Sequence, residues 1–312
     1  MHNLTKAFVT AALGASIASS SLAHEVGAWA GASSAPAERS EVSVAQVDGK
    51  AYVVGDYNGA TDLLIYDLAK DTWSKGAPFP YAVHHTAAVS IGRTIYVIGG
   101  YVDGWKATNN VWAYNTASDT WSELGKMPTA VAAAGAAVLD GKIHVVGGSK
   151  SGRGNIPFHL VYDPEAKSWT EAAPPPTKRD HLSVVALDGK LVAVGGRING
   201  SPGSNLDVNQ IYDPKSNSWT SGKPLPTARS GSASAVLGHE AFVMGGEGSG
   251  KVFNEVEAYD LPKNSWRAFS PLPTGRHGFG AVVHDGKIFT IVGSPAPGGN
   301  RSSVVEVLTP GK

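Results

Sequence analysis

The sequence predicts an all-β protein in which six similar four-stranded units surround a common axis as a β-propeller. Six tryptophans recur at intervals of 44 to 50 residues, and a proline follows each of them seven residues later. Twenty-six residues after each tryptophan, an apolar segment ends on a glycine doublet or a related pair. A four-stranded sheet of about 48 residues cannot bury both of its faces alone, so we expect the repeated sheets to stack. The repeated tryptophans are Trp29, Trp73, Trp121, Trp169, Trp219 and Trp266.

Each unit is predicted to contain four strands in a fixed order. The first is small and apolar, as in GSASAVL at 231–237, which suits a crowded strand covered on both faces. The Asp-Gly pair in LDGK at 187–190 then favours a two-residue hairpin turn. The second strand is rich in β-branched residues and ends on glycines, as in IYVIGG at 95–100. The third and fourth strands, at 208–219, flank an Asp-Pro turn and carry a tyrosine and a tryptophan that we expect to pack together.

Residues 27–41, GAWAGASSAPAERSE, have the composition of a linker but are predicted to supply an outer strand. This segment repeats the tryptophan, proline and arginine of the sixth unit at the same spacing, beginning at Trp29 and at Trp266 respectively. The last unit, in contrast, reaches Lys312 without a tryptophan of its own. We therefore predict that this segment pairs with the C-terminal strand at 303–309 and closes the ring, which removes two exposed sheet edges.

The first 23 residues are predicted to be a signal peptide, and residues 24–312 a single propeller domain. Lys6 precedes an apolar stretch at 7–18, and Ser-Leu-Ala at 21–23 offers the small residues that signal peptidase reads. The apolar stretch is too short to span a bilayer, so we expect no membrane insertion. The expected location is periplasmic or secreted.

Composition excludes several classes of function. The chain has 26 basic and 26 acidic residues, so its net charge gives no reason to expect nucleic acid as a partner. It has no cysteine, which excludes a disulfide framework, a thiolate metal site and a thiol nucleophile.

The double glycine, the Tyr-x6-Trp pair and the following Pro-x2-Arg resemble the kelch repeat over essentially all of residues 24–312. The resemblance implies a six-bladed kelch-type β-propeller. It leaves the activity open, because kelch propellers include enzymes, adaptors and structural proteins. Members of the family commonly bind ligands on the face that carries the loops after the glycine doublets. In this chain those loops and the Pro-x2-Arg connections are also the more varied ones, which favours the same face.

Both sets of connections carry basic and aromatic side chains, which together predict a basic funnel for an anionic sugar, an acidic peptide or a protein. The arginine of Pro-x2-Arg belongs to the repeat, so hydrogen bonding between blades is an alternative role for it. Trp105 interrupts the repeat in a loop and is a candidate for stacking on a ligand. The predicted ligand-binding residues are Arg39, His85, Tyr101, Asp103, Trp105, Arg153, Arg179, His181, Arg197, Arg229, Glu247, Arg276 and His277.

Histidines begin the innermost strands of alternate units, at His84 and His85, at His181 and at His277. Alternate blades of a six-bladed ring would bring these side chains near the axis. They lie eleven or twelve residues after their tryptophans, so the two sets are expected to point to opposite sides of their strands. No His-x-His or His-Glu-x-x-His spacing indicates a metal. We therefore expect histidines that line a channel, with no metal and no cofactor.

The sequence favours an exported module that binds a protein or an anionic carbohydrate, with no catalytic residue assigned. The alternative is a carbohydrate epimerase or mutarotase, since the chain is more distantly similar to the exported, six-bladed sialic-acid mutarotases. That similarity implies that Glu247 transfers protons and that an arginine holds the substrate carboxylate. A copper-radical oxidase like galactose oxidase is excluded, because its cofactor requires a cysteine.

Overall fold

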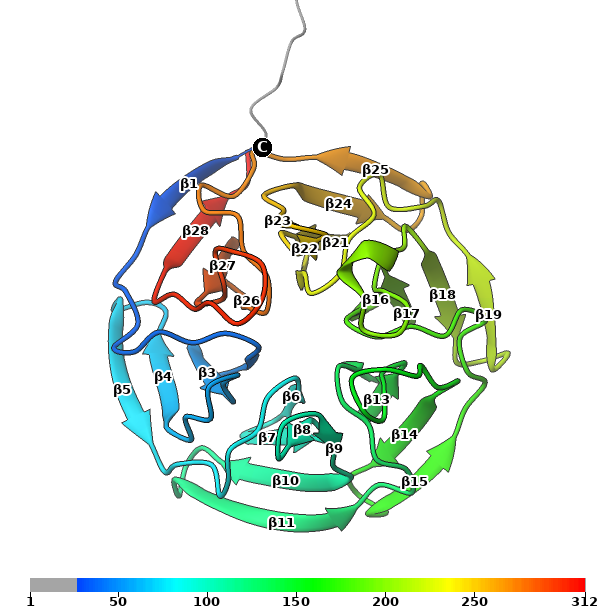
Figure 1. Ribbon diagram of the computed structural model, residues 1–312, viewed down its shortest axis with the longest axis horizontal. Coiled ribbons are helices and arrows are strands. Elements are labelled where there is room, and N and C mark those ends of the chain that lie inside the picture. The colour runs from blue at the N-terminus through cyan, green and yellow to red at the C-terminus, as the bar shows by residue number, and fades with distance from the viewer. Residues whose placement is uncertain (1–26, 312) are drawn as a thin grey trace, which may run out of the picture.

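The computed structural model describes residues 27–311 and shows six four-stranded antiparallel sheets around one axis (Figure 1). This confirms the predicted all-β, six-bladed propeller. The predicted signal peptide, residues 1–23, and the expected mature terminus at His24 lie outside the described residues. Between residues 27 and 311 the only helix is a short 3-10 turn, η1 (Pro202–Ser204), and no helix there has the length and apolarity to cross a membrane.

The blades follow one another along the chain, and the strands of each blade are stacked outward from the axis. The first blade contains, from its innermost to its outermost strand, β2 (Ser43–Val47), β3 (Lys50–Val54), β4 (Leu63–Asp67) and β5 (Thr72–Gly76). The second contains β6 (Ala87–Ile91), β7 (Thr94–Ile98), β10 (Asn110–Asn115) and β11 (Thr120–Lys126) in the same order. The third contains β12 (Gly135–Leu139), β13 (Lys142–Val146), β14 (His159–Asp163) and β15 (Ser168–Glu171).

The remaining blades repeat this order, and two of the six blades carry an additional small hairpin. The fourth blade contains β16 (Ser183–Leu187), β17 (Lys190–Val194), β18 (Asn209–Asp213) and β19 (Ser218–Ser221). The fifth contains β20 (Ala233–Leu237), β21 (Glu240–Met244), β24 (Val256–Asp260) and β25 (Ser265–Ala268). The sixth contains β26 (Gly280–His284), β27 (Lys287–Ile291), β28 (Val305–Thr309) and β1 (Ala28–Gly31). The small hairpins are β8 (Tyr101–Val102) with β9 (Lys106–Ala107) and β22 (Glu247–Gly248) with β23 (Lys251–Val252).

The ring is closed by the segment that resembles a linker. Trp29 pairs with Leu308 in an antiparallel ladder between β1 and β28. The indole of Trp29 donates to the carbonyl of Ser270 at 2.9 Å, so the strand also contacts the fifth blade. In Figure 1, the first and last coloured strands lie side by side at the top of the ring.

Tyrosine and tryptophan pair within a blade, and the indole of five of the six tryptophans also joins the blade to the preceding connection. In the fourth blade, Tyr212 lies opposite Trp219 across β18 and β19, with ring centroids 5.2 Å apart. The Trp219 indole donates to the carbonyl of Ala173 in the preceding connection at 2.6 Å. The predicted aromatic pair is present in all five units that carry the tyrosine, and the centroid distances are 4.7–5.2 Å.

Six large apolar clusters lie in the described part of the chain, one between each pair of neighbouring blades, and a small seventh cluster contains Tyr101, Ala132 and Ala133. Between the fourth and fifth blades, for example, Val192 and Val194 pack with Ala241 and Val243. Each sheet therefore buries both faces against its neighbours, which explains the alternation of small and branched apolar residues in the inner strands. This packing leaves the axis itself free for polar side chains.

Candidate functional site

The site is built on one position of the repeat, twelve residues after each tryptophan. All six residues at this position have a positive φ, between 51° and 64°. The amides of five of them donate to the carbonyl of the counterpart in the preceding blade at 2.8–3.1 Å. At the sixth position, Glu41, the amide of the next residue, Val42, closes the circle by donating to Gly278 at 3.3 Å. The six positions are Glu41, His85, Ala133, His181, Gly231 and Gly278.

This backbone ring holds side chains in a conformation that disfavours them. A positive φ costs a residue other than glycine about 1 kcal/mol or more. Glycine occupies two of the six positions, yet three others carry the ionisable side chains of Glu41, His85 and His181. Such strain at converging polar groups is typical of functional sites.

Two further positions of the repeat bring polar groups to the same place. The residue eleven positions after the tryptophan forms a β-bridge with the residue that follows the glycine doublet. Asp180 is bridged in this way to Arg197, and Ser230 to Glu247. Because the bridge recurs from blade to blade, side chains from both positions converge on the axis, on the face of the post-glycine loops.

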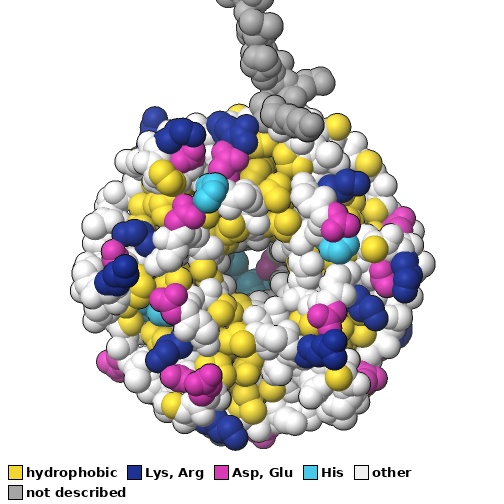
Figure 2. All heavy atoms as spheres, turned by 180° about the vertical axis from the view of Figure 1, so that it is seen from behind, with side chains coloured by type: hydrophobic (Ala, Val, Ile, Leu, Met, Phe, Trp, Pro, Cys, Tyr) yellow, Lys and Arg dark blue, Asp and Glu magenta, His cyan; other side chains and the backbone are white. Residues whose placement is uncertain are grey.

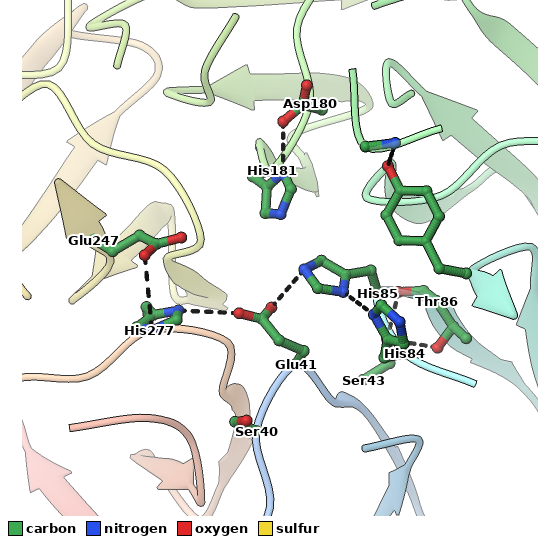
Figure 3. A network of polar contacts seen from close by, with 12 residues as sticks. Ser40, Glu41, Ser43, His84, His85, Thr86, Asp180, His181, Glu247 and His277 are labelled. Carbon is green, nitrogen blue, oxygen red and sulfur yellow. Dashed lines mark hydrogen bonds and ion pairs between the residues drawn. The ribbon is translucent and has the colours of Figure 1, made fainter. Parts of the chain in front are cut away.

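Glu41 lies at the centre of the resulting polar network, between two histidines (Figure 3). Its Oε1 lies 3.0 Å from Nδ1 of His277, and its Oε2 lies 3.1 Å from Nε2 of His85. The imidazole of His277 also approaches Glu247, with 3.8 Å between Nε2 and Oε2. The carboxylate of Glu41 is therefore held by side chains from the second and sixth blades.

Arg197 connects the other side of the network. Its guanidinium binds Glu247 and lies 3.4 Å from Asp180 Oδ1. Its Nη2 lies 2.8 Å from Nε2 of His181, whose Nδ1 lies 2.5 Å from the same Asp180 oxygen. The positive charge of Arg197 is thus balanced by two carboxylates inside the site.

Burial and these contacts separate the pKa values of the ionisable groups. Burial alone would raise the pKa of Glu41, but the His85 and His277 rings at its oxygens hold that pKa well below its usual range. Burial opposes the charge of His277, yet the Glu41 and Glu247 carboxylates raise its pKa above the ordinary value. The pKa of His85 falls well below its ordinary value because burial outweighs the Glu41 charge. The Glu41 carboxylate and the His277 ring therefore stabilise each other's charged form.

A cavity of about 400 Å³ opens over this network. It is lined by Glu41, Arg197, Glu247 and His277, and by the half-exposed aromatic rings of Tyr57 and Trp105. The centroids of these two rings lie 6.1 Å apart, and Trp105 is 43 % exposed. Figure 2 shows the opposite face, where a central opening surrounded mostly by uncharged side chains has histidine and acidic groups at its bottom. The polar network therefore lies on the axis between the two faces.

Comparison with known proteins identifies the family. The model of the KLHDC2/KLHL20/DRC7 Kelch-repeats domain matches residues 41–224 and, in an overlapping second match, residues 85–293. The chain belongs to the kelch-repeat family. The solved structure titled "Structure of YjhT" resembles this kelch propeller with a TM-score of 0.78, covering 88 % of this chain and 95 % of that one. At 20 % sequence identity, this likeness shows the fold alone.

A curated relative matches a shorter part of the kelch propeller. The Rho GTPase-activating protein gacHH of Dictyostelium discoideum is 34 % identical over 86 residues. That stretch is 25 % of this chain and 6 % of the relative, so the chain spans a small fraction of that protein's length.

The structure brings together most of the predicted residues outside the arginine repeat. His85, Trp105, Arg197, Glu247 and His277 line the cavity directly. The buried residues His181 and Tyr101 support it: His181 contacts Arg197, and Tyr101 packs against Trp105 with a centroid distance of 5.0 Å. Of the two remaining residues, Arg153 lines an adjoining cavity that shares Trp105 and Arg197, whereas Asp103 lies exposed in the turn between β8 and β9.

The four arginines of the Pro-x2-Arg motif require a correction. Their side chains are buried within the blades instead of lining a funnel: Arg179, Arg229 and Arg276 are each 0 % exposed. Arg179 donates to the Gly195 carbonyl at 2.8 Å, for example. The other partners are Glu257 for Arg229, Glu306 for Arg276, and the Glu38 carbonyl for Arg39. The structural alternative for these arginines is therefore the correct one, and the cavity is not a basic funnel.

The histidines also depart from the expected geometry. The sequence predicts that His84 and His277 point away from His85 and His181, as alternate residues of a strand do. Instead, Nδ1 of His84 contacts Nδ1 of His85 at 2.5 Å, and His277 and His85 both contact Glu41. The reason is the positive φ of the residue twelve positions after each tryptophan. It takes His85 and His181 out of the strand conformation, so that side chains of successive residues no longer point to opposite sides.

Sequence reasoning missed Glu41, Tyr57 and Asp180. Glu41 has the same offset from its tryptophan as His85 and His181, and Tyr57 has the same offset as Arg197 and Glu247. Asp180, in turn, has the same offset from its tryptophan as His277. A comparison of all six repeats at these three offsets would have found all three residues. Glu41 was missed because it ends the segment at 27–41, which was interpreted only as the outer strand that closes the ring.

Proposed function

We propose that this chain is an exported kelch propeller that binds a small polar carbohydrate in the cavity on its axis. The observation that carries the proposal is the composition of that cavity. Two partly exposed aromatic rings, Tyr57 and Trp105, lie beside the polar side chains of Glu41, Arg197 and Glu247. Its volume of about 400 Å³ lies within the range of small-molecule sites.

The two kinds of side chain match the two kinds of surface on a sugar. The C–H face of a sugar ring is apolar and packs on an aromatic ring, as other apolar groups do. Each hydroxyl can donate and accept a hydrogen bond, and the carboxylates and the guanidinium in the cavity offer both partners. Since Arg197 is already balanced by Glu247 and Asp180, the cavity offers no excess positive charge to select a sugar acid.

A screen of neutral sugars and sugar acids by thermal shift tests this proposal. At least one saccharide is expected to raise the melting temperature by several degrees at saturating concentration, because it binds only the folded state. Trp105→Ala is expected to weaken that ligand at least about 10-fold by removing the stacking surface. Leu124→Ala removes another exposed apolar side chain, on β11, and is expected to leave binding unchanged. The absence of a shift with every saccharide would contradict the proposal and favour a protein ligand.

A carbohydrate mutarotase or epimerase is the second candidate. It is supported by Glu247 and Arg197, which line one cavity in direct contact with each other. Proton NMR of anomer exchange in sialic acid and in any sugar found by the screen tests this activity. Glu247→Gln is expected to slow exchange at least about 100-fold, whereas Glu165→Gln, on an exposed outer turn, is expected to have no effect. Exchange at the uncatalysed rate with the unaltered protein would exclude this candidate.

Export is proposed on the pattern of residues 1–23 alone. Intact-mass analysis of the protein recovered outside the cytoplasm is expected to give a chain that begins at His24. A mass that includes Met1 would contradict export by a cleaved signal peptide.

A further inference from the structure

His277 directs one ring nitrogen, Nδ1, at the Glu41 carboxylate, and no hydrogen bond of good geometry joins the two groups. Its Nε2 lies 3.2 Å from the carbonyl of Ala296, which accepts only, so this nitrogen carries the proton in the neutral ring. Nδ1 then presents its lone pair to Glu41 Oε1, 3.0 Å away. Among the described residues Nδ1 has no aligned hydrogen-bond partner, although the side chain is only 2 % exposed. A lone pair that faces a carboxylate oxygen is unfavourable unless a cation or a proton lies between them.

The same arrangement recurs on the other side of Glu41. Nε2 of His84 donates to the carbonyl of Gly104 at 2.9 Å, so its Nδ1 must accept the hydrogen bond from Nδ1 of His85. Nε2 of His85 then directs its lone pair at Glu41 Oε2, 3.1 Å away. Histidines that bind metals are held in this way, with the outer nitrogen donating to a carbonyl or another acceptor.

Glu247 supplies a third ligand on the side of His277. One ligand atom from each of Glu41, Glu247 and His277 lies within 4.8 Å of the other two. A metal ion with bonds of about 2.1 Å holds its ligands roughly 3–4 Å apart, so a small closure of these side chains suffices. The opposite group, Glu41 with His85 and His181, is less suited, because Asp180 and Arg197 engage both ring nitrogens of His181. On Glu247, Arg197 engages Oε1 and leaves Oε2 facing His277.

We propose that Glu41, Glu247 and His277 bind one divalent first-row transition-metal ion, with its remaining coordination positions open to the cavity. One imidazole and two carboxylates suit Zn²⁺, Ni²⁺ or Mn²⁺, whereas Ca²⁺ and Mg²⁺ prefer oxygen ligands alone. The spacing of the histidines did not predict this site, because its three ligands come from three different repeats. The inference does not rest on carbohydrate binding, since it uses only the side chains of the protein.

Metal titration of the full chain, purified without a histidine tag and treated with a chelator, tests the site directly. Isothermal titration with Zn²⁺ and Ni²⁺ is expected to give one site per chain with micromolar or tighter affinity. Co²⁺ is expected to give the visible absorption bands of a protein-bound ion. No saccharide is present in these titrations, so their failure is distinguishable from a failure of the carbohydrate proposal.

Two variants and a matched control locate the metal. His277→Gln and Glu247→Gln each remove one ligand and are expected to weaken binding at least about 100-fold. His144→Gln changes a buried histidine of the third blade, away from the axis, and is expected to leave affinity unchanged. If His277→Gln does not fold, as judged by its thermal melt without metal, Glu247→Gln carries the test. The proposal is wrong if the unaltered protein shows no saturable metal binding. It is also wrong if the two ligand variants bind metal as tightly as His144→Gln does. In either case, the contact between Glu41 and His277 is an ion pair only.

Discussion

His144 and His159 form a buried pair inside the third blade, far from the polar network on the axis. Nδ1 of His159 donates to the carbonyl of Ala173, which leaves its Nε2 to accept from Nδ1 of His144 at 2.9 Å. Burial lowers the pKa of each imidazole to about 4. At the scale of single residues, histidine therefore has two roles here: a neutral hydrogen-bonding group within a blade, and part of a charged cluster at the axis.

This pair predicts a pH dependence of stability. Because the pKa of both histidines is lower in the folded chain than in the unfolded chain, the unfolded chain binds protons first as the pH falls. The stabilisation is complete above the ordinary pKa of about 6.5 and is lost as the pH falls from there to about 4. Since one pKa unit corresponds to about 1.4 kcal/mol, each histidine is expected to contribute about 3 kcal/mol to the unfolding free energy lost over this range.

Chemical denaturation at pH 7 and at pH 4.5 measures this effect. The double variant His144→Gln/His159→Gln is expected to lose less stability between the two pH values than the unaltered chain. Equal losses in the two proteins would show that other groups cause the acid sensitivity.

The second strand of most blades ends on a glycine that lies against the following blade. Gly195 follows β17 with a φ of 63°, and a Cβ atom there would lie 2.6 Å from the carbonyl oxygen of Arg229. The next amide, that of Gly196, donates to this same carbonyl at 3.0 Å. At the scale of elements, the glycine doublet therefore permits both the turn at the end of the strand and the close approach of two blades.

Gly195→Ala is expected to lower the unfolding free energy by about 2–4 kcal/mol, because it adds a backbone clash to an unfavourable φ. Gly141→Ala is the matched control. Gly141 also has a positive φ, 74°, but a Cβ there would meet no atom within 4 Å. This control is expected to cost only about 1 kcal/mol. Equal losses in urea denaturation would show that close approach to the next blade is not the constraint.

The whole molecule depends on β1 to complete the ring. Without this strand, β28 would be an unpaired edge, and the partly buried Trp29 would be lost from the cluster between the fifth and sixth blades. The ring is also continuous at the axis, where the backbone bonds of the six blades form a closed circle. Loss of one outer strand is therefore expected to weaken the contact between the fifth and sixth blades and so affect the entire propeller.

A chain that begins at Ala35 is expected to be less stable than one that begins at Gly27 by about 3 kcal/mol or more, the usual cost of losing a large apolar side chain and its strand. Both chains lack residues 1–26, so the comparison isolates β1. Thermal and urea unfolding measure the difference. Equal melting temperatures would show that β1 does not hold the ring together.

The order of the repeat was sufficient to predict the architecture. The offsets among Trp219, Tyr212 and the glycine doublet at Gly195 depend on local turns and strand alternation, which operate within one repeat and can be read directly from the sequence. The same offsets predicted the aromatic pairs, the glycine turns and the pairing of β1 with β28. The positions of Trp105 and Glu247 on one face also followed from the alternation of strand direction.

The tertiary structure decided which side chains make the site. Arg229 and Arg197 are both arginines near the start or end of an inner strand, but one is buried beside Glu257 within a blade and the other lies on the axis. Glu41 and His277 are far apart in the chain, and their contact of 3.0 Å exists only because the ring closes. The sequence by itself determined the repeated unit, since its constraints are local. Closure of the ring and the positive φ angles at the axis decided which side chains line the cavity and what charge they carry, because both arise only when six units meet.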